Sequence, residues 1–428
     1  MSAAAPASLG PAPQVAGRRG VVLAMLLLVY IFNFLDRQIL SILAAPVQAE
    51  LGLDDAQMGL LGGVSFAILY STLAVPLAWL ADRTSRSWVI TVSLVVWSGF
   101  TALCGLAGSF WQIFLARLGV GVGEAGGVAP SYAIIGDYFP SGQRAFALSI
   151  YSLGIPVGSA AGVLAGGYIA AMLDWRLAFF AVGICGIVIA PFFKLLVKDL
   201  PRPAAVTQET NGRSLRQVAG TLAHKPSFWL LSLGAASGSM LGYGIAFWLP
   251  SLLQRSFDLS LVETSQFFGA VLLLGGVAGV LAGGWLGDRL GTRDRAWYGW
   301  LPAIAYVTGV PLFALGIASD NVGFAFAMFL LPQALAYIWL GPVLTAVQHL
   351  VPPPERATAS ALFLLINNLL GLGGGIYALG ALSTLLTPVY ADEALRYSML
   401  YSLTLYLLAG TLMALAGRYL RKEWVAEA

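Results

Sequence analysis

Long apolar runs alternate with short polar turns from residue 20 to about residue 420. Each run holds about 20 residues or more, the length that an α-helix needs to cross the hydrocarbon core of a bilayer. The pattern predicts an all-α membrane protein with twelve transmembrane helices, at 20–46, 57–81, 88–109, 111–138, 142–172, 175–198, 226–254, 261–287, 297–318, 322–350, 354–387 and 395–420.

Composition supports this prediction. The 428 residues are 58% hydrophobic and only 10% charged, whereas soluble domains are about 25% charged. Fifty glycines suit helices that pack closely in lipid, where small residues let backbones approach. The formal net charge of +3 is too small to indicate a nucleic-acid partner, so the bilayer is the expected surrounding.

The distribution of basic residues predicts the orientation. Of the 23 Lys and Arg residues, eighteen fall in turns on the side of the N-terminus, and only Arg176, Arg255 and Arg396 fall in turns on the other side. Cytoplasmic loops carry the excess of Lys and Arg. We therefore expect both termini to be cytoplasmic, in a multi-pass protein of the cell's inner (plasma) membrane.

The chain also repeats itself. Asp82-Arg83 follows span two and Asp288-Arg289 follows span eight, 206 positions later; Pro140-x-x-x-Arg144-Ala-x-Ala and Pro352-x-x-x-Arg356-Ala-x-Ala lie 212 positions apart. Two pairs at nearly one offset indicate a duplicated six-helix unit. The predicted parts are a disordered tail (1–19), an N-terminal bundle (20–198), a cytoplasmic linker (199–225), a C-terminal bundle (226–422) and a short tail (423–428).

Four of the 43 charged residues lie well within predicted spans, and all four are in the N-terminal half. In span four, Arg117 and Glu124 are two helical turns apart and share one face; in span one, Asp36 and Arg37 share a face with Asn33. A charge near the bilayer centre costs about 2.5 kcal/mol or more. We expect acids to pair with bases across these two helices, either as a permanent ion-pair network or as a site that responds to protons and substrate.

The C-terminal half has no deeply placed charge. Its polar candidates for substrate binding or gating are Tyr243, Gln333, Tyr337, Asn367 and Asn368, accompanied by Phe247, Trp248 and Trp339. An apolar, aromatic half opposite a charged half suits an amphiphilic substrate. Alternatively, these aromatic residues face lipid or neighbouring helices.

The loop after span eight, Gly284-Trp-Leu-Gly-Asp288-Arg289-Leu-Gly291-Thr-Arg293, resembles the loop signature of the major facilitator superfamily. The loop after span two carries Asp82, Arg83 and Arg86, with Ala78 and Ser85 where the signature has glycine. Asp82 and Asp288 would each meet the N-terminus of span eleven or five in the other half. With Arg356 and Arg144 they would form a cytoplasmic gate, unless these are ordinary flanking charges.

The run Arg117-x-x-x-Gly121-x-Gly123-Glu124-Ala, with Asn33-x-x-Asp36-Arg37, resembles the Spinster branch of that superfamily, as does Asp174-Trp175-Arg176 before Ala178-Phe179-Phe180. The resemblance implies a secondary transporter that works by alternating access and exports lysophospholipids or sphingolipids. It casts Asp36 and Glu124 as proton-coupling acids, and Arg117 as a headgroup or gating residue.

Other functions fit less well. A membrane enzyme would need a nucleophile, a base or a metal cluster, and the sequence offers no such constellation. We expect no enzyme activity, no cofactor, no metal and a monomer. The alternatives within transport are proton-coupled efflux of a small polar solute or drug, and uncoupled facilitation.

Overall fold

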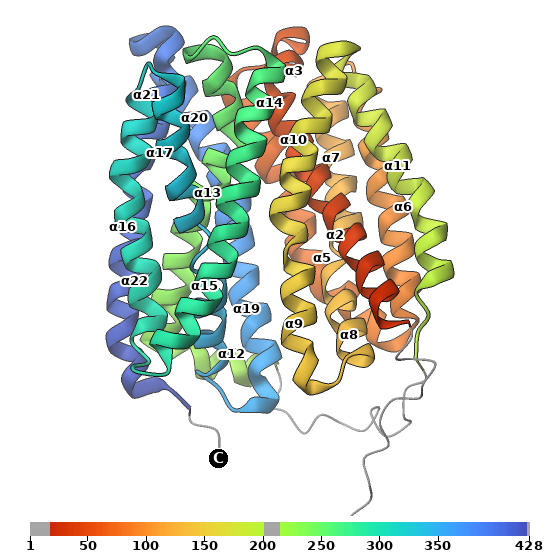
Figure 1. The fold of residues 1–428 in the computed structure, drawn as a ribbon, viewed down its shortest axis with the longest axis vertical. Helices are drawn as coiled ribbons and strands as arrows, with labels where there is room; N and C mark the ends of the chain where they lie inside the picture. The colour runs from red at the N-terminus through yellow and green to blue at the C-terminus, as the bar shows by residue number, and fades with distance from the viewer. Residues whose placement is uncertain (1–17, 201–214, 426–428) are drawn as a thin grey trace, which may run out of the picture.

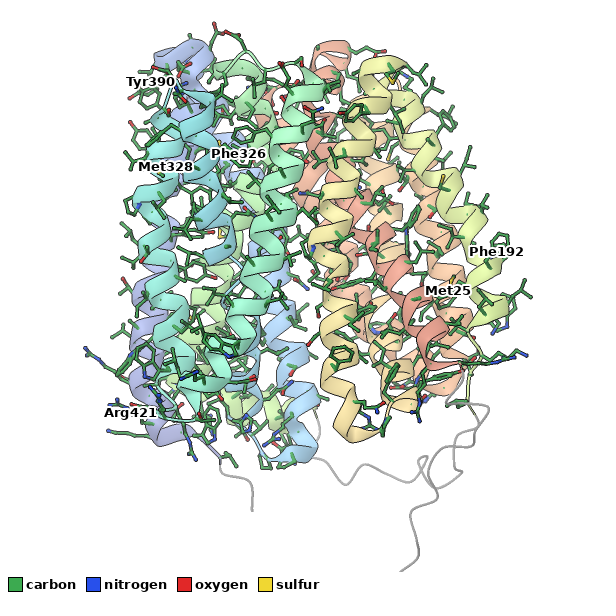
Figure 2. The ribbon with its side chains drawn as sticks, in the orientation of Figure 1. Met25, Phe192, Phe326, Met328, Tyr390 and Arg421 are labelled. Carbon is green, nitrogen blue, oxygen red and sulfur yellow. The ribbon has the colours of Figure 1, made fainter. Side chains whose placement is uncertain are left out.

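The computed structural model describes residues 18–200 and 215–425, and these residues are helical almost throughout, without a β-strand. The predicted all-α fold is confirmed. Figure 1 shows two helical bundles side by side, one from each half of the chain. Apolar side chains such as Phe192 point outward from the bundles (Figure 2), as expected for a surface that faces lipid.

Six passes form the first bundle. They are α2 (Arg19–Ile42), extended by α3 (Ala44–Leu51); α4 (Asp55–Gly59), η1 (Leu60–Val64) and α5 (Ser65–Arg83); α6 (Arg86–Cys104); α7 (Phe110–Glu124) and α8 (Val128–Tyr138); α9 (Ser141–Ser152) and α10 (Gly154–Met172); and α11 (Trp175–Leu196).

The second bundle is built in the same way. Its passes are α13 (Pro226–Ser256); α14 (Leu261–Ala270), η3 (Val271–Gly275) and α15 (Gly276–Gly291); α16 (Trp297–Ala318); α17 (Val322–Leu335) and α18 (Leu340–Gln348); η4 (Pro353–Glu355), α19 (Arg356–Asn367), η5 (Asn368–Gly374) and α20 (Gly375–Tyr390); and η6 (Ala391–Glu393), α21 (Ala394–Ser402) and α22 (Thr404–Glu423).

Eleven helical stretches among the described residues are long and apolar enough to cross a membrane. The last of them, Arg356–Glu423, is 68 residues long. The chain reverses within it at Ala391, whose φ is 47°, and α21 then packs against α20. This stretch therefore supplies two passes.

Local structure repeats between the bundles as well. Asp54 and Gln57 form a capping box at the start of α4, and Ser260 and Glu263 form one at the start of α14, 206 positions later. Asp82 and Asp288 are separated by the same 206 positions. In each half this cap is followed by a π-helical turn, η1 or η3. The two halves thus share local structure that is not evident from a comparison of their overall sequences.

The predicted linker, 199–225, contains a further helix, α12 (Leu215–Ala223), which packs against α19. Much of the linker and the predicted 1–19 tail lies outside the described residues. At the other end, Trp424 stacks on His349 with ring centroids 4.4 Å apart. The Val425 amide also donates to the His349 carbonyl at 2.8 Å. The first residues of the predicted 423–428 tail are therefore attached to the second bundle.

Candidate functional site

A cavity lies between the two bundles and is lined by residues of both. The first bundle contributes residues of α2, η1, α5, α7 and α10 to its wall, and the second contributes residues of α13, α16, α17, η5, α20 and α22. Its charged lining residues are Arg37 and Arg117. Both come from the first bundle, so the two sides of the cavity differ in charge.

Glycines hold the helices that carry these charges close together. A Cβ atom at Gly158 or Gly162 of α10 would lie 2.4 Å from a backbone carbonyl oxygen of α2, on Ile31 or Leu35. A Cβ at Gly121 of α7 would lie 2.5 Å from the Phe66 carbonyl oxygen. These contacts leave no room for a side chain. They hold α2 against α10 and α7 against α5.

Arg37 and Glu124 form the predicted ion pair between spans one and four, with Arg37 Nε 2.6 Å from Glu124 Oε2. Glu124 is fully buried and ends α7, where the helix dipole disfavours a negative charge, so the Arg37 cation compensates it. Three rings also surround the Arg37 guanidinium carbon, with centroids 5.0, 4.8 and 4.5 Å away, on Phe34, Phe66 and Tyr70. This aromatic contact was not anticipated from the sequence.

Asp36 is bound differently. Its carboxylate accepts a hydrogen bond from the Thr101 hydroxyl of α6, in span three, and its side chain is 1% exposed. The sequence prediction considered acid–base pairs between spans one and four and missed this threonine. Nothing in the sequence distinguishes Thr101 from the other small polar residues of that span.

Arg117 supplies the second cation of the cavity wall. It is 2% exposed, and its guanidinium carbon lies 5.3 Å from the Phe66 ring centroid. Arg117 Nε and Nη1 and Arg37 Nη2 have no hydrogen-bond partner among the described residues. Since buried polar groups are normally satisfied, the wall presents guanidinium groups that suit an anion.

The predicted coupling acids lie behind this wall rather than in it. Asn33, Asp36 and Glu124 are buried, and none of them lines the cavity. Consecutive helix positions point about 100° apart, so Arg37 lines the cavity while the neighbouring Asp36 bonds Thr101 of α6.

Most of the polar candidates of the second half reach the cavity. Tyr243, Gln333 and Tyr337 line it, together with the predicted aromatics Phe247 and Trp339. Asn367 does not; its side-chain oxygen accepts from the Ser239 hydroxyl at 2.9 Å, and Ser239 lines the cavity in its place. Asn368 and Trp248 are also absent from the lining.

The helix ends that carry predicted gate residues, such as the starts of α9 and α19, lie at the lower end of the molecule in Figure 1, which is the end with the basic loops. Arg86 binds Asp82 at 3.0 Å and also Asp137 of α8 at 2.6 Å, a partner that the sequence did not suggest. Arg144 donates to the Phe139 carbonyl at 2.9 Å. Among the other predicted gate residues, Arg83 and Arg289 lie over the rings of Trp79 and Trp285, Asp288 and Arg293 are exposed, and Arg356 begins α19.

The opposite end of the molecule holds a polar link between the halves. Arg255 donates to both carboxylate oxygens of Asp55, at 2.9 and 2.8 Å. Gln48 bonds both residues, and the Ser383 hydroxyl donates to Asp55 at 2.7 Å. Sequence reasoning missed this cluster because each member resembles an ordinary turn residue.

Within the described ranges, no three His, Cys, Asp or Glu side chains gather as a metal site requires.

Comparisons with known proteins agree with this arrangement. Residues 26–376 match the family model described as Major Facilitator Superfamily. The chain is 32% identical over 415 residues to an MFS-type efflux pump of Mycolicibacterium smegmatis, covering 96% of this chain and 95% of that protein. It is 28% identical over 412 residues to protein spinster homolog 1 of Homo sapiens, covering 90% and 78%.

A solved structure is similar over nearly the whole chain. It is the crystal structure of a bacterial homolog to the human lysosomal transporter Spinster, in an inward-facing and unoccupied conformation. The TM-score is 0.86 at 28% sequence identity, and the match covers 98% of this chain and all of that one (100%).

Proposed function

Because this chain belongs to the major facilitator superfamily and is a transporter of the Spinster type, we propose that it is a proton-coupled secondary transporter of anionic amphiphiles. The substrate class is that of lysophospholipids and sphingolipid phosphates, carried by alternating access. We place the protein in the inner (plasma) membrane with both termini in the cytoplasm, on the strength of the basic loops.

The pair of guanidinium groups in the cavity wall carries this proposal. Arg37 and Arg117 have buried N–H groups without partners among the described residues, and both side chains line the cavity. A phosphate accepts several such hydrogen bonds at once. The facing wall carries the apolar rings of Phe247, Phe313 and Trp339, beside polar residues such as Tyr243 and Gln333, and these rings suit an acyl or alkyl chain.

Coupling to protons follows from the position of Glu124. An anion that binds Arg37 competes with Glu124 for the same guanidinium group. A buried carboxylate that loses its cation is stabilised by taking up a proton, because an unpaired charge in a dry site is costly. Asp36, held by Thr101 on the far side of the wall, is the second candidate for this role.

Two observations support alternating access in an inward-facing state. Asp55 and Arg255 join the halves at the end away from the basic loops, and α4 packs there against α20 of the other half. With the basic loops taken as cytoplasmic, this closed end is the outer one. The similar crystal structure is also inward-facing.

Flux in proteoliposomes tests the proposal. Uptake of a lysophosphatidate is measured with and without a pH gradient, for the wild type and for Asp36→Asn and Glu124→Gln. We expect both variants to lose gradient-dependent flux. Their melting temperatures should stay above the assay temperature, so that both are folded during the measurement. Glu50→Gln, which removes an acid outside the cavity at 48% side-chain exposure, is the control. Gradient-dependent flux in both variants would place the coupling elsewhere.

Efflux of a small polar solute or drug is the second candidate, favoured by the similarity to an MFS-type efflux pump. A series of lysolipids with one headgroup and increasing chain length separates the two. Binding should strengthen as the tail lengthens, by about 0.8 kcal/mol for each buried CH₂ group. Affinity that ignores the tail would exclude the lipid class.

A further inference from the structure

The cavity extends into the second bundle, beyond the residues that the transport proposal uses. Phe313 of α16 and Tyr406 of α22 belong to its lining. α22 packs against α13, and α16 packs against α17. Gly238 and Gly242 also line the cavity, and they lie four residues apart on one face of α13. Because these positions have no side chain, side chains of neighbouring helices can approach the backbone of α13 there.

Two tyrosines occupy the space beside these glycines. A Cβ atom at Gly238 would lie 2.4 Å from the hydroxyl oxygen of Tyr306, and one at Gly242 would lie 3.8 Å from that of Tyr406. The two rings are 4.8 Å apart, centroid to centroid. Each tyrosine is 1% exposed. Both hydroxyl groups therefore lie deep in the protein, next to the glycine face.

Neither hydroxyl has a hydrogen-bond partner among the described residues. Buried tyrosines usually have one, because a buried donor without a partner costs free energy that an apolar residue would avoid. Phenylalanine would fill the same space without this cost. The packing of the protein thus gives no chemical reason for the two hydroxyls, and Tyr406 is one of the residues that line the cavity.

We propose that Tyr306 and Tyr406 form a second polar subsite, which donates hydrogen bonds to a neutral acceptor oxygen of the substrate. This inference rests on the proposed function. The anionic group would bind Arg37 and Arg117, and an oxygen further along the molecule would reach the tyrosine pair. The acyl ester carbonyl of a lysolipid is an acceptor of this kind.

The surroundings favour a neutral acceptor over a second charge. Apolar rings lie beside the pair. The ring centroid of Phe313 is 6.0 Å from that of Tyr406, and Phe313 in turn lies 6.2 Å from Phe329. The charged residues of the cavity lining, Arg37 and Arg117, belong to the other half. An anion beside the tyrosines would have no nearby cation of the lining to balance it.

A matched pair of lipids tests the subsite. The probes are 1-palmitoyl lysophosphatidate, which has an ester carbonyl, and its 1-hexadecyl ether counterpart, which lacks that carbonyl. Binding of each to the purified full-length protein is measured for the wild type, Tyr306→Phe and Tyr406→Phe. Tyr298→Phe, on a tyrosine whose ring stacks on Trp424 rather than on either member of the pair, is the control. Melting temperatures are recorded for every variant.

We expect the wild type to bind the ester more tightly than the ether. Tyr406→Phe should weaken ester binding about fivefold and leave ether binding unchanged, the size expected for one neutral hydrogen bond. Tyr306→Phe should act in the same direction. Melting temperatures should not fall, since the lost hydroxyls have no partner in the described protein. An equal loss for both lipids, or no loss for either, would overturn the subsite.

Failure of the transport proposal would look different. If the wild type bound neither lipid, or if Arg37→Gln bound both as tightly as the wild type, the substrate class itself would be wrong, and the tyrosine subsite would be wrong with it. Normal binding of both lipids with no ester preference overturns the subsite alone.

Discussion

The two halves of this transporter share a scaffold and differ in chemistry. Both bundles begin their second pass with a capping box and a π-helical turn, and both pack through glycines. The first half buries Asp36, Arg117 and Glu124 in its core and places the partly buried Arg37 at the cavity. The second half lines the cavity with tyrosines and other aromatic residues. Duplication therefore preserved the geometry of the repeat but not its polar groups.

This difference separates two tasks that one substrate requires. A cation pair backed by carboxylates can hold an anionic group and respond to protons, whereas an aromatic wall can hold a chain of carbon atoms. The halves move against each other in alternating access. A substrate that contacts both halves would therefore bridge the two moving parts, and changes on either side should affect different portions of the molecule.

The largest effect is expected from Arg37→Gln in the charged half. It leaves Glu124 fully buried without its cation. Removing one partner of a buried pair costs about 3–5 kcal/mol. We expect a clear fall in the melting temperature of the purified protein at neutral pH, together with loss of lysophosphatidate binding.

The double variant Arg37→Gln/Glu124→Gln is the control for this prediction. It removes both charges, so most of the lost stability should return while binding stays absent. If the double variant were as unstable as the single one, the stability effect would come from the contacts of Arg37 with Phe34, Phe66 and Tyr70 rather than from charge.

Replacing a closely packed glycine by alanine should lower the stability of the protein equally in either half. A Cβ at Gly162 would lie 2.4 Å from the Leu35 carbonyl oxygen, and one at Gly375 would lie 2.1 Å from the Met240 carbonyl oxygen. Because backbone atoms cannot move aside cheaply, alanine at either position should destabilise the protein by about 1–3 kcal/mol. Thermal unfolding in detergent measures the change.

Gly99→Ala is the matched control for these two variants. Nothing lies within 4 Å of a Cβ at Gly99, in the middle of α6. Alanine is a better helix former than glycine, by up to about 1 kcal/mol. Its melting temperature should therefore stay the same or rise. A fall as large as that of Gly162→Ala would show that an effect of the added methyl group other than close packing, such as lipid contact, governs these positions.

The sequence predicted the fold better than the site, for physical reasons. The length of apolar runs follows directly from bilayer thickness, so the passes and the all-α fold could be read from the pattern. The expectation that an acid and a base pair across spans one and four followed from the high cost of buried charge, but the choice of Arg37 and Glu124 as the partners came from the structure. Thr101, Tyr306 and Tyr406 carry no such cost signal, since a hydroxyl in a membrane helix is common. Only the packing of distant segments gives these residues their meaning.

The outer link between the halves should have a smaller effect. Arg255→Gln removes both hydrogen bonds to Asp55, whose side chain is 10% exposed. Loss of a partly exposed pair costs about 1 kcal/mol, which shifts the balance between inward- and outward-open states about fivefold. A cysteine at Ser239, in protein without Cys104 and Cys185, should react faster with an impermeant maleimide added from the outer side.

Arg176→Gln is the control for this shift. Arg176 binds Glu50 at 2.6 Å at the same end of the molecule, but both residues belong to the first half. Breaking this pair should leave the labelling rate unchanged. Equal acceleration in both variants would mean that surface charge, rather than the link between halves, controls access.

The smallest effect concerns Asp199, beyond the end of α11. Partial burial acts to raise its pKa, but hydrogen bonds from the Ser85 and Ser87 hydroxyls and the Ser87 amide outweigh burial and hold the pKa below its ordinary value. A lowered pKa in the folded state means that Asp199 stabilises the fold at pH values above its unfolded pKa, near 3.9. This contribution is lost as the pH falls through the folded pKa.

The difference in melting temperature between wild type and Asp199→Asn should therefore be constant from pH 7 to about pH 5 and shrink in acid. Exposure limits the effect to less than about 1 kcal/mol. Asp294, whose pKa Arg421 lowers in the second half, should behave in the same way; a difference that grew in acid for either residue would contradict the assignment.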